Sequence, residues 1–123
     1  MILVDTSVWI DHLRARDKTL VELLLAKQVL GHPFIIGEIA LGHLPERRQV
    51  LNSLRDLPQA VVASQDEVLD LIEREHLFGF GIGYVDAHLL AATRLTEGAS
   101  LWTRDKRLLS AGESLALTRS TPA

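Results

Sequence analysis

The 123-residue chain contains no cysteine. This absence excludes a disulfide framework and any zinc or iron–sulfur site held by thiolates. It also suits the reducing interior of a cell, so we expect a cytoplasmic protein. The histidines show no zinc-binding spacing and are interpreted as structural or surface residues: His12, His32, His43, His76 and His88.

Long apolar runs and an excess of basic residues are also missing. No stretch approaches the ~20 apolar residues of a membrane helix, and no signal peptide precedes the first strand-like segment, so no membrane association is expected. The net charge is −3, unlike that of a protein that holds nucleic acid by overall charge alone. A nucleic-acid substrate would therefore need local basic side chains or a bound metal ion.

What the chain does have is enough apolar sequence for one core. Hydrophobic residues make up 47% of its composition, and the length is that of one domain, which we predict over residues 1–123. Short apolar segments alternate with longer amphipathic ones. This alternation predicts an α/β fold with a mainly parallel central sheet of four to five strands in an α/β/α sandwich.

The predicted elements follow from apolar periodicity, caps and breakers. Strands are expected at residues 2–4, 28–31, 60–63 and 100–103, with an edge strand at 115–118 and a frayed tail at 119–123. Helices are expected from Asp5 or Thr6 to about residue 14, around residues 20–25, from Pro33 to Leu41, from Pro45 through Leu54, from Ser64 to about residue 75, from Tyr84 to Thr96 and from Lys106 to Gly112.

Four acidic residues stand out against this pattern. Asp5 and Asp105 each follow an apolar strand and precede a helix, so both are expected at the same edge of the sheet. Asp86 lies in the first turn of a helix after the glycine-rich loop 78–83, and Glu38 is the lone acid of an apolar helix. Each also has a plainer interpretation, as a helix cap, a first-turn acid or a surface residue.

If the four carboxylates converge, their charges need compensation. Two unit charges about 5 Å apart repel by roughly 3 kcal/mol at an effective dielectric near 20. The site must then bind a cation or take up protons. Oxygen ligands select hard cations such as Mg²⁺ or Mn²⁺, which commonly serve phosphoryl chemistry.

Four segments, in this order, resemble PIN-domain ribonucleases, and in particular VapC-type toxins of toxin–antitoxin pairs. They are Leu3-Val4-Asp5-Thr6-Ser7, the isolated Glu38, Gly83-Tyr84-Val85-Asp86-Ala87-His88-Leu89-Leu90-Ala91 and Leu101-Trp102-Thr103-Arg104-Asp105. The resemblance spans essentially the whole chain.

The resemblance implies a set of site residues. Asp5, Glu38, Asp86 and Asp105 would be the catalytic, metal-holding acids. Thr6 and Thr103 would hydrogen-bond these carboxylates and orient them.

The resemblance also implies an activity and partners. The chain would be a Mg²⁺-dependent endoribonuclease, with Mn²⁺ able to substitute, that cuts single-stranded RNA by metal-activated water and leaves a 5′-phosphate and a 3′-hydroxyl. It would form a homodimer and be inhibited by a VapB-type antitoxin that places an Arg or Lys among the acids.

Two further sets of residues concern binding. Arg104 and Arg107 adjoin the predicted site, and we expect them to contact RNA phosphates. The helices before residue 42 carry more apolar residues than one buried stripe needs, which favours a homodimer and a groove for an amphipathic partner. These residues are Leu20, Val21, Leu24, Leu25, Ile35, Ile36 and Ile39.

Two alternatives remain open. One is a Mg²⁺-dependent phosphatase of the haloacid-dehalogenase type, which also has an Asp at the end of its first strand. That family needs a second Asp two residues later, where this chain has Ser7. The other is a non-catalytic PIN-fold binding module, which sequence alone does not separate from an enzyme.

Overall fold

The computed structural model describes residues 1–118, so the predicted tail at 119–123 and the end of the predicted domain lie outside the described residues. Three parallel strands, β1 (Ile2–Val4), β2 (Val29–Leu30) and β3 (Ser100–Trp102), form a sheet in the order β2-β1-β3. The helices are α1 (Thr6–Arg14), α2 (Lys18–Leu25), α3 (Pro33–Ala40), α4 (Arg47–Asp56), α5 (Gln65–Arg74), α6 (Tyr84–Leu95) and α7 (Lys106–Ser114), with a short 3-10 helix, η1 (Leu77–Gly79).

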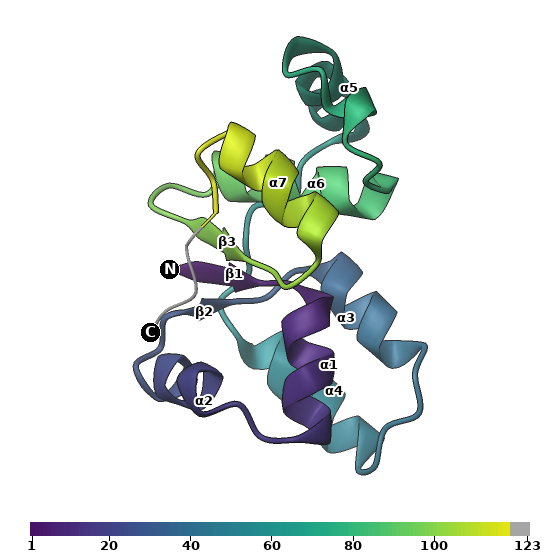
Figure 1. The fold of residues 1–123 in the computed structure, drawn as a ribbon. Helices are drawn as coiled ribbons and strands as arrows, with labels where there is room; N and C mark the ends of the chain where they lie inside the picture. The colour runs from purple at the N-terminus through teal and green to yellow at the C-terminus, as the bar shows by residue number, and fades with distance from the viewer. Residues whose placement is uncertain (119–123) are drawn as a thin grey trace.

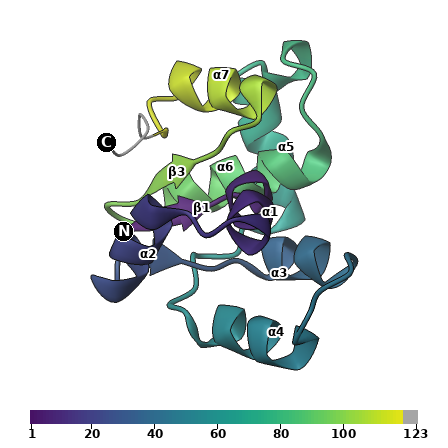
Figure 2. The ribbon, with the colours of Figure 1, turned by 60° about the horizontal axis from the view of Figure 1, so that its bottom comes forward.

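The first strand is the centre of the molecule. It pairs with both other strands, with Leu3 opposite Leu30 on one side and Leu101 on the other. All three of its residues are buried, as its uninterrupted apolar run predicts for a strand covered on both faces. Helices α5, α6 and α7 lie on one side of the strands and α3 and α4 on the other (Figures 1 and 2).

The parallel strands bring three helix starts to one edge of the sheet. β1 leads into α1, β2 into α3 and β3 into α7, and Figure 1 shows these three connections at the same end of the strands. The edge beyond the carboxyl ends of parallel strands is the usual place for a ligand site. Helix α6 packs against β3, and its residues 87–93 are all buried, so its N-terminal turn is held firmly beside that edge.

The predicted sheet of four to five strands was wrong for the described residues, which form three strands. The predicted strand at 60–63 is not formed. One bridge, between Gly31 and Gln59, lies just before it, and within it the N–H of Val61 donates to the side chain of Thr96. The predicted edge strand at 115–118 is likewise one bridge, between Leu101 and Thr118. There Ala116 has φ of 58°, a left-handed conformation that an extended strand cannot contain.

Helix boundaries are otherwise close to the predictions. The fourth helix begins at Arg47 and not at Pro45, because Glu46 has φ of 52° and cannot continue a right-handed helix. The predicted capping box at the start of α5 is present, with Ser64 and Glu67 each accepting the other's backbone N–H. Within residues 1–118, no helix is long and apolar enough to cross a bilayer.

The apolar residues that favoured a dimer are divided between core and surface. Leu20, Ile35 and Ile39 are buried within the chain, so the surface role predicted for them was wrong. Leu25 is 80% exposed, while Val21, Leu24 and Ile36 are half-buried. The apolar surface of α2 and α3 is therefore smaller than the sequence suggests.

Burial of His32 generates a prediction for pH-dependent stability. Its Nδ1 accepts the backbone N–H of Phe34 at 3.0 Å and caps α3, while its side chain is fully buried. Burial, and then the nearby His88, lower the pKa of His32 to about 4. Between about pH 6.5 and pH 4, His32 is protonated in the unfolded chain and neutral in the folded chain. The free energy of unfolding therefore decreases as the pH falls from about 6.5 toward 4.

We expect His32 to reduce the free energy of unfolding by about 2 kcal/mol between pH 7 and pH 5. Urea unfolding at both pH values measures this loss. The His32→Asn variant, which keeps a capping side chain, should have a smaller pH dependence, whereas His43→Asn at an exposed position should match the wild type. Equal pH dependence in the wild type and the His32→Asn variant would contradict the prediction.

Candidate active site

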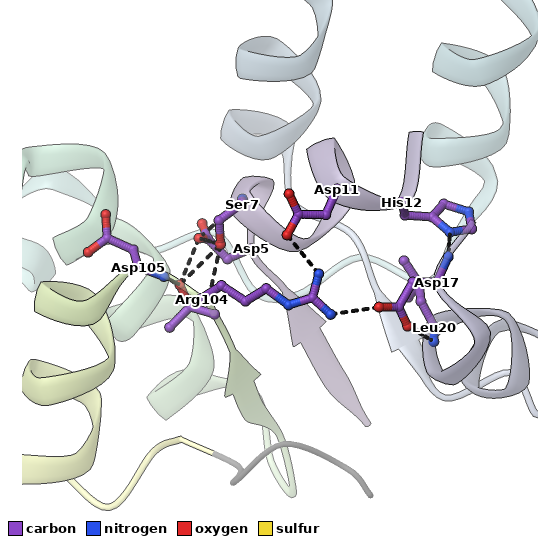
Figure 3. A network of polar contacts seen from close by, with 9 residues as sticks. Asp5, Ser7, Asp11, His12, Asp17, Leu20, Arg104 and Asp105 are labelled. Carbon is purple, nitrogen blue, oxygen red and sulfur yellow. Dashed lines mark hydrogen bonds and ion pairs between the residues drawn. The ribbon is translucent and has the colours of Figure 1, made fainter. Parts of the chain in front are cut away.

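Asp5 is the buried acid at the end of β1. Its Oδ2 accepts hydrogen bonds from the hydroxyls of Ser7 at 2.7 Å and Thr103 at 2.8 Å, and a longer one from the Ser7 N–H at 3.3 Å (Figure 3). The side chain also caps α1. Thr103 follows β3, so the contact joins two neighbouring strand ends and fixes the orientation of the carboxylate.

Ser7 contacts the candidate site in a way that the sequence analysis did not predict. Its hydroxyl donates to Asp5 and accepts the backbone N–H of Arg104 at 3.0 Å. It thereby connects the start of α1 to the loop after β3. The sequence did contain a local indication of this contact. A serine two positions after an Asp at the end of a strand is well placed to donate a hydrogen bond to that carboxylate.

Glu38 enters the site from the exposed face of α3. Its Oε1 accepts the hydroxyl of Thr6 at 2.7 Å, which ties α3 to the first turn of α1. The apolar neighbours Ile35 and Ile39 are buried, so the helix turns Glu38 away from the core. An acid in this apolar helix is accommodated by exposure and by one hydroxyl donor.

Asp105 caps α7, where its Oδ1 accepts the N–H groups of Arg107 at 2.9 Å and Leu108 at 3.0 Å. Its own N–H donates to the Thr103 hydroxyl at 3.1 Å. Thr103 therefore contacts both Asp5 and Asp105 and fixes the spacing between them.

Asp86 lies in the first turn of α6, where Oδ2 accepts the N–H of Gly83 at 3.4 Å. Its pKa is raised, first by burial and then by the negative charges of Asp5, Asp105 and Glu38. A carboxyl group responds in this way when like charges are near. The fold therefore brings the four predicted acids, which come from four separate elements, within electrostatic reach of one another.

The four acids share one arrangement of their oxygens. Among the described residues, hydrogen bonds reach one carboxylate oxygen of each and not the other. The unbonded oxygens are Oδ1 of Asp5, Oε2 of Glu38, Oδ1 of Asp86 and Oδ2 of Asp105. The bonded oxygens set the orientation, which leaves one acceptor per acid for a ligand. Capping and ligand binding are thus compatible. Asp5 and Asp105 each cap a helix with one carboxylate oxygen, and the other oxygen remains available for a ligand.

The donor chemistry fits a hard divalent cation. The available atoms are carboxylate oxygens, the ligands that Mg²⁺ and Mn²⁺ prefer, and their mutual repulsion favours a positive ion. Within residues 1–118, no three acidic or histidine side chains already stand close enough together to hold a metal ion. The residues therefore fit such an ion in type and charge, without defining a coordination geometry.

The two predicted RNA-contacting arginines differ in their surroundings. Arg107 is exposed, and its Nη1 donates to the carbonyl of Gly81 at 3.5 Å in the glycine-rich loop. Arg104 extends away from Asp105 and pairs with Asp11 and Asp17 (Figure 3). Contact with RNA stays a prediction for both.

Comparison with known proteins agrees with this architecture. The model of the PIN domain family matches residues 2–113. Two curated relatives, each named Ribonuclease VapC32, come from the CDC 1551 / Oshkosh and ATCC 25618 / H37Rv strains of Mycobacterium tuberculosis. Each is 55% identical over 111 residues, which cover 90% of this chain and 90% of the relative.

The repulsion on Asp86 generates a prediction for stability. In EDTA, Asp86→Asn should keep or raise the melting temperature, by up to about 5 °C, because it removes a charge that burial disfavours first and the neighbouring acids disfavour further. Asp66→Asn is the matched control: Asp66 is an exposed first-turn acid of α5 that loses only a favourable interaction with its helix dipole. Mg²⁺ should raise the melting temperature of the wild type more than that of Asp86→Asn. An Asp86→Asn protein that melts below the Asp66→Asn control would show that the charge stabilises the fold.

Proposed function

The chain belongs to the PIN-domain family, and we propose that it is a VapC-type endoribonuclease that cleaves single-stranded RNA with Mg²⁺, or with Mn²⁺ in its place. The observation that carries the proposal is that four carboxylates from separate elements lie within electrostatic reach of one another, each oriented through one oxygen. Hydroxyls that orient these acids, and an Asp86 pKa raised by burial and by neighbouring charges, are typical of catalytic sites. The name Ribonuclease VapC32 of the relatives supports the reaction class.

Asp5, Asp86 and Asp105 would hold the metal, and Glu38 would hold a second ion or orient the attacking water. When bound, a divalent cation supplies positive charge that activates water and stabilises charge on the phosphodiester oxygens. Thr103 keeps Asp5 and Asp105 in place, and Thr6 does the same for Glu38. Oε2 of Glu38 is free to accept a proton from the water, which leaves the Oε1 contact with Thr6 intact.

Water is the proposed nucleophile because no side chain is activated to attack. The sequence contains no cysteine. Within the described residues, no hydrogen bond joins a histidine to a serine or threonine hydroxyl, the pairing that activates such a nucleophile. The family resemblance implies that this hydrolysis leaves a 5′-phosphate and a 3′-hydroxyl.

The site also argues against the two alternatives. A haloacid-dehalogenase-type phosphatase is not favoured, because Ser7 holds the position of its second Asp and uses its hydroxyl to orient Asp5. A non-catalytic PIN module would retain the fold but would have no use for the unbonded carboxylate oxygens.

We expect metal-dependent cleavage of single-stranded RNA that EDTA abolishes and Mn²⁺ restores. Asp5→Asn should lower the rate at least about 100-fold, because it weakens a charged ligand while keeping its shape. Ser64→Ala, which removes a cap of α5 away from the acids, serves as a control for unspecific damage. Sequencing of the product ends and parallel assay of a small phosphate monoester separate the three candidate functions. Full RNA cleavage in EDTA would overturn the proposal.

Two grooves beside α1 support an antitoxin-binding role. One, of about 340 Å³, is lined by Glu38 together with apolar residues that include Ile10, Leu13 and Leu44. The other, of about 360 Å³, lies between α1, α2 and α4 and shares Leu13 with the first. An amphipathic antitoxin segment would lay its apolar face into these grooves and bring a basic side chain to the acids.

The proposed homodimer would use the apolar surface that the core leaves exposed. Leu25 at the end of α2 and Leu41 after α3 are 80% and 90% exposed. Exposed leucines of this kind occur at interfaces between subunits. Sedimentation at tens of micromolar measures the dimer, and Leu25→Glu should shift it toward the monomer.

Charge replacement by the antitoxin is tested with a VapB-type peptide. We expect the peptide to inhibit RNA cleavage, and replacement of its basic residues by Ala to weaken inhibition at least about tenfold, since the acids lose the compensating charge. Leu13→Glu should weaken the same peptide by disrupting both grooves. A fully inhibitory Ala-substituted peptide would show that the acids do not recognise a basic side chain.

A further inference from the structure

Arg104 lies between two residues of the site but does not point into it. It stands between Thr103 and Asp105, and Figure 3 shows its guanidinium on the opposite side of its backbone from the Asp105 carboxylate. Nη1 lies 2.8 Å from Oδ2 of Asp11, and Nη2 lies 2.6 Å from Oδ2 of Asp17. One side chain therefore joins the loop after β3 to the middle of α1 and to the start of α2.

The surroundings of Arg104 hold this conformation from several sides. Its guanidinium carbon lies 5.4 Å from the centre of the buried Trp102 ring, within the range of a cation–π contact. Its backbone N–H donates to Ser7 at 3.0 Å. Asp17 is itself fixed, because it caps α2 through the Leu20 N–H and its own N–H donates to His12.

We propose that Arg104 is a positioning residue that anchors residues 103–105 to α1 and α2 and so keeps Thr103 and Asp105 in place beside Asp5. The proposal rests on the proposed nuclease function and adds a residue to it. We call Arg104 and its two ion-pair partners, Asp11 and Asp17, the Arg104 clamp.

The charges around the guanidinium argue against a direct RNA contact in this conformation. Two carboxylates already pair with the one guanidinium, so it is not available to a phosphate in this conformation. The pairing lowers the pKa of Asp17 and raises that of Arg104, as expected when each charge stabilises the other. RNA could recruit the guanidinium only by displacing both acids.

The clamp affects the reaction through geometry more than through stability. The side chains of Arg104, Asp11 and Asp17 are 36%, 51% and 18% exposed, and ion pairs near solvent stabilise a fold only weakly. A displacement of about 1 Å at a catalytic group can nevertheless reduce a rate about 100-fold. Thr103 and Asp105 flank Arg104 directly in the chain, so any movement of residue 104 reaches them.

The test compares Arg104→Ala, Arg104→Lys, Asp11→Asn and Asp17→Asn with Arg94→Ala as the matched control. Arg94 pairs with Glu75 at 3.1 Å with similar exposure, but on α6 and the end of α5. Asn at position 17 keeps a capping side chain for α2. Lysine cannot span both carboxylates as the planar guanidinium does, so Arg104→Lys should rescue activity only in part.

If Arg104 positions the site, Arg104→Ala lowers kcat about 10- to 100-fold with KM within about twofold of the wild type. Asp11→Asn and Asp17→Asn lower kcat in the same direction, and their effects are not additive with Arg104→Ala. Arg94→Ala leaves kcat unchanged. The backbone amides of Arg104 and Asp105 exchange hydrogen at least about tenfold faster in Arg104→Ala, because their bonds to Ser7 and Thr103 open more often.

Effects on RNA binding in place of effects on kcat would overturn the proposal. An RNA-contacting Arg104 gives a raised KM and a shallower salt dependence in Arg104→Ala, while Asp11→Asn and Asp17→Asn strengthen RNA binding by releasing the guanidinium. A lower kcat with unchanged amide exchange also contradicts positioning. A different outcome overturns the nuclease function alone. In that case the wild type does not cleave RNA, but amide exchange is still faster in Arg104→Ala, which supports the anchoring role of Arg104.

Discussion

Carboxylates gathered in one place repel one another, and the polar contacts at the edge of the sheet oppose that repulsion. Burial raises the pKa of Asp86 first, and the negative charges of Asp5, Asp105 and Glu38 raise it further. The hydroxyls of Ser7 and Thr103 hold Asp5 by donating to one of its oxygens, and Thr6 holds Glu38 in the same way. Each bond replaces one contact with water and leaves the other oxygen available. The site is therefore set to receive positive charge.

This arrangement requires a rigid support. β1 is buried on both faces and paired on both edges, so Asp5 is fixed by the centre of the fold. Asp86 begins a helix with seven consecutive buried residues. Asp105 and Glu38 are exposed, and hydroxyl and backbone contacts hold them in place of packing. The acids thus range from the buried Asp5 through the half-buried Asp86 to the exposed Glu38 and Asp105.

The sequence predicted those features that local patterns encode. An apolar run followed by an acid and a helix located Asp5 and Asp105, and a lone acid in an apolar helix located Glu38. The number of strands was overestimated because a short apolar run does not reveal that its N–H groups bond elsewhere, as the bond from Val61 to Thr96 shows. Asp11 and Asp17 were missed as partners of Arg104 because 93 and 87 residues separate them along the chain. No local pattern reports a contact of that kind.

The pairing of the first strand with one near the other end of the chain has a consequence for biosynthesis. Asp5 is made 98 residues before its partner Thr103, so their contact forms only after β3 has taken its place beside β1. A nascent chain that ends before residue 103 carries Asp5, Glu38 and Asp86 but neither Thr103 nor the fourth acid. The central strand is also unpaired on one edge until then. Between the synthesis of β1 and that of β3, the growing chain therefore carries Asp5 without the hydroxyl that orients it from the neighbouring strand.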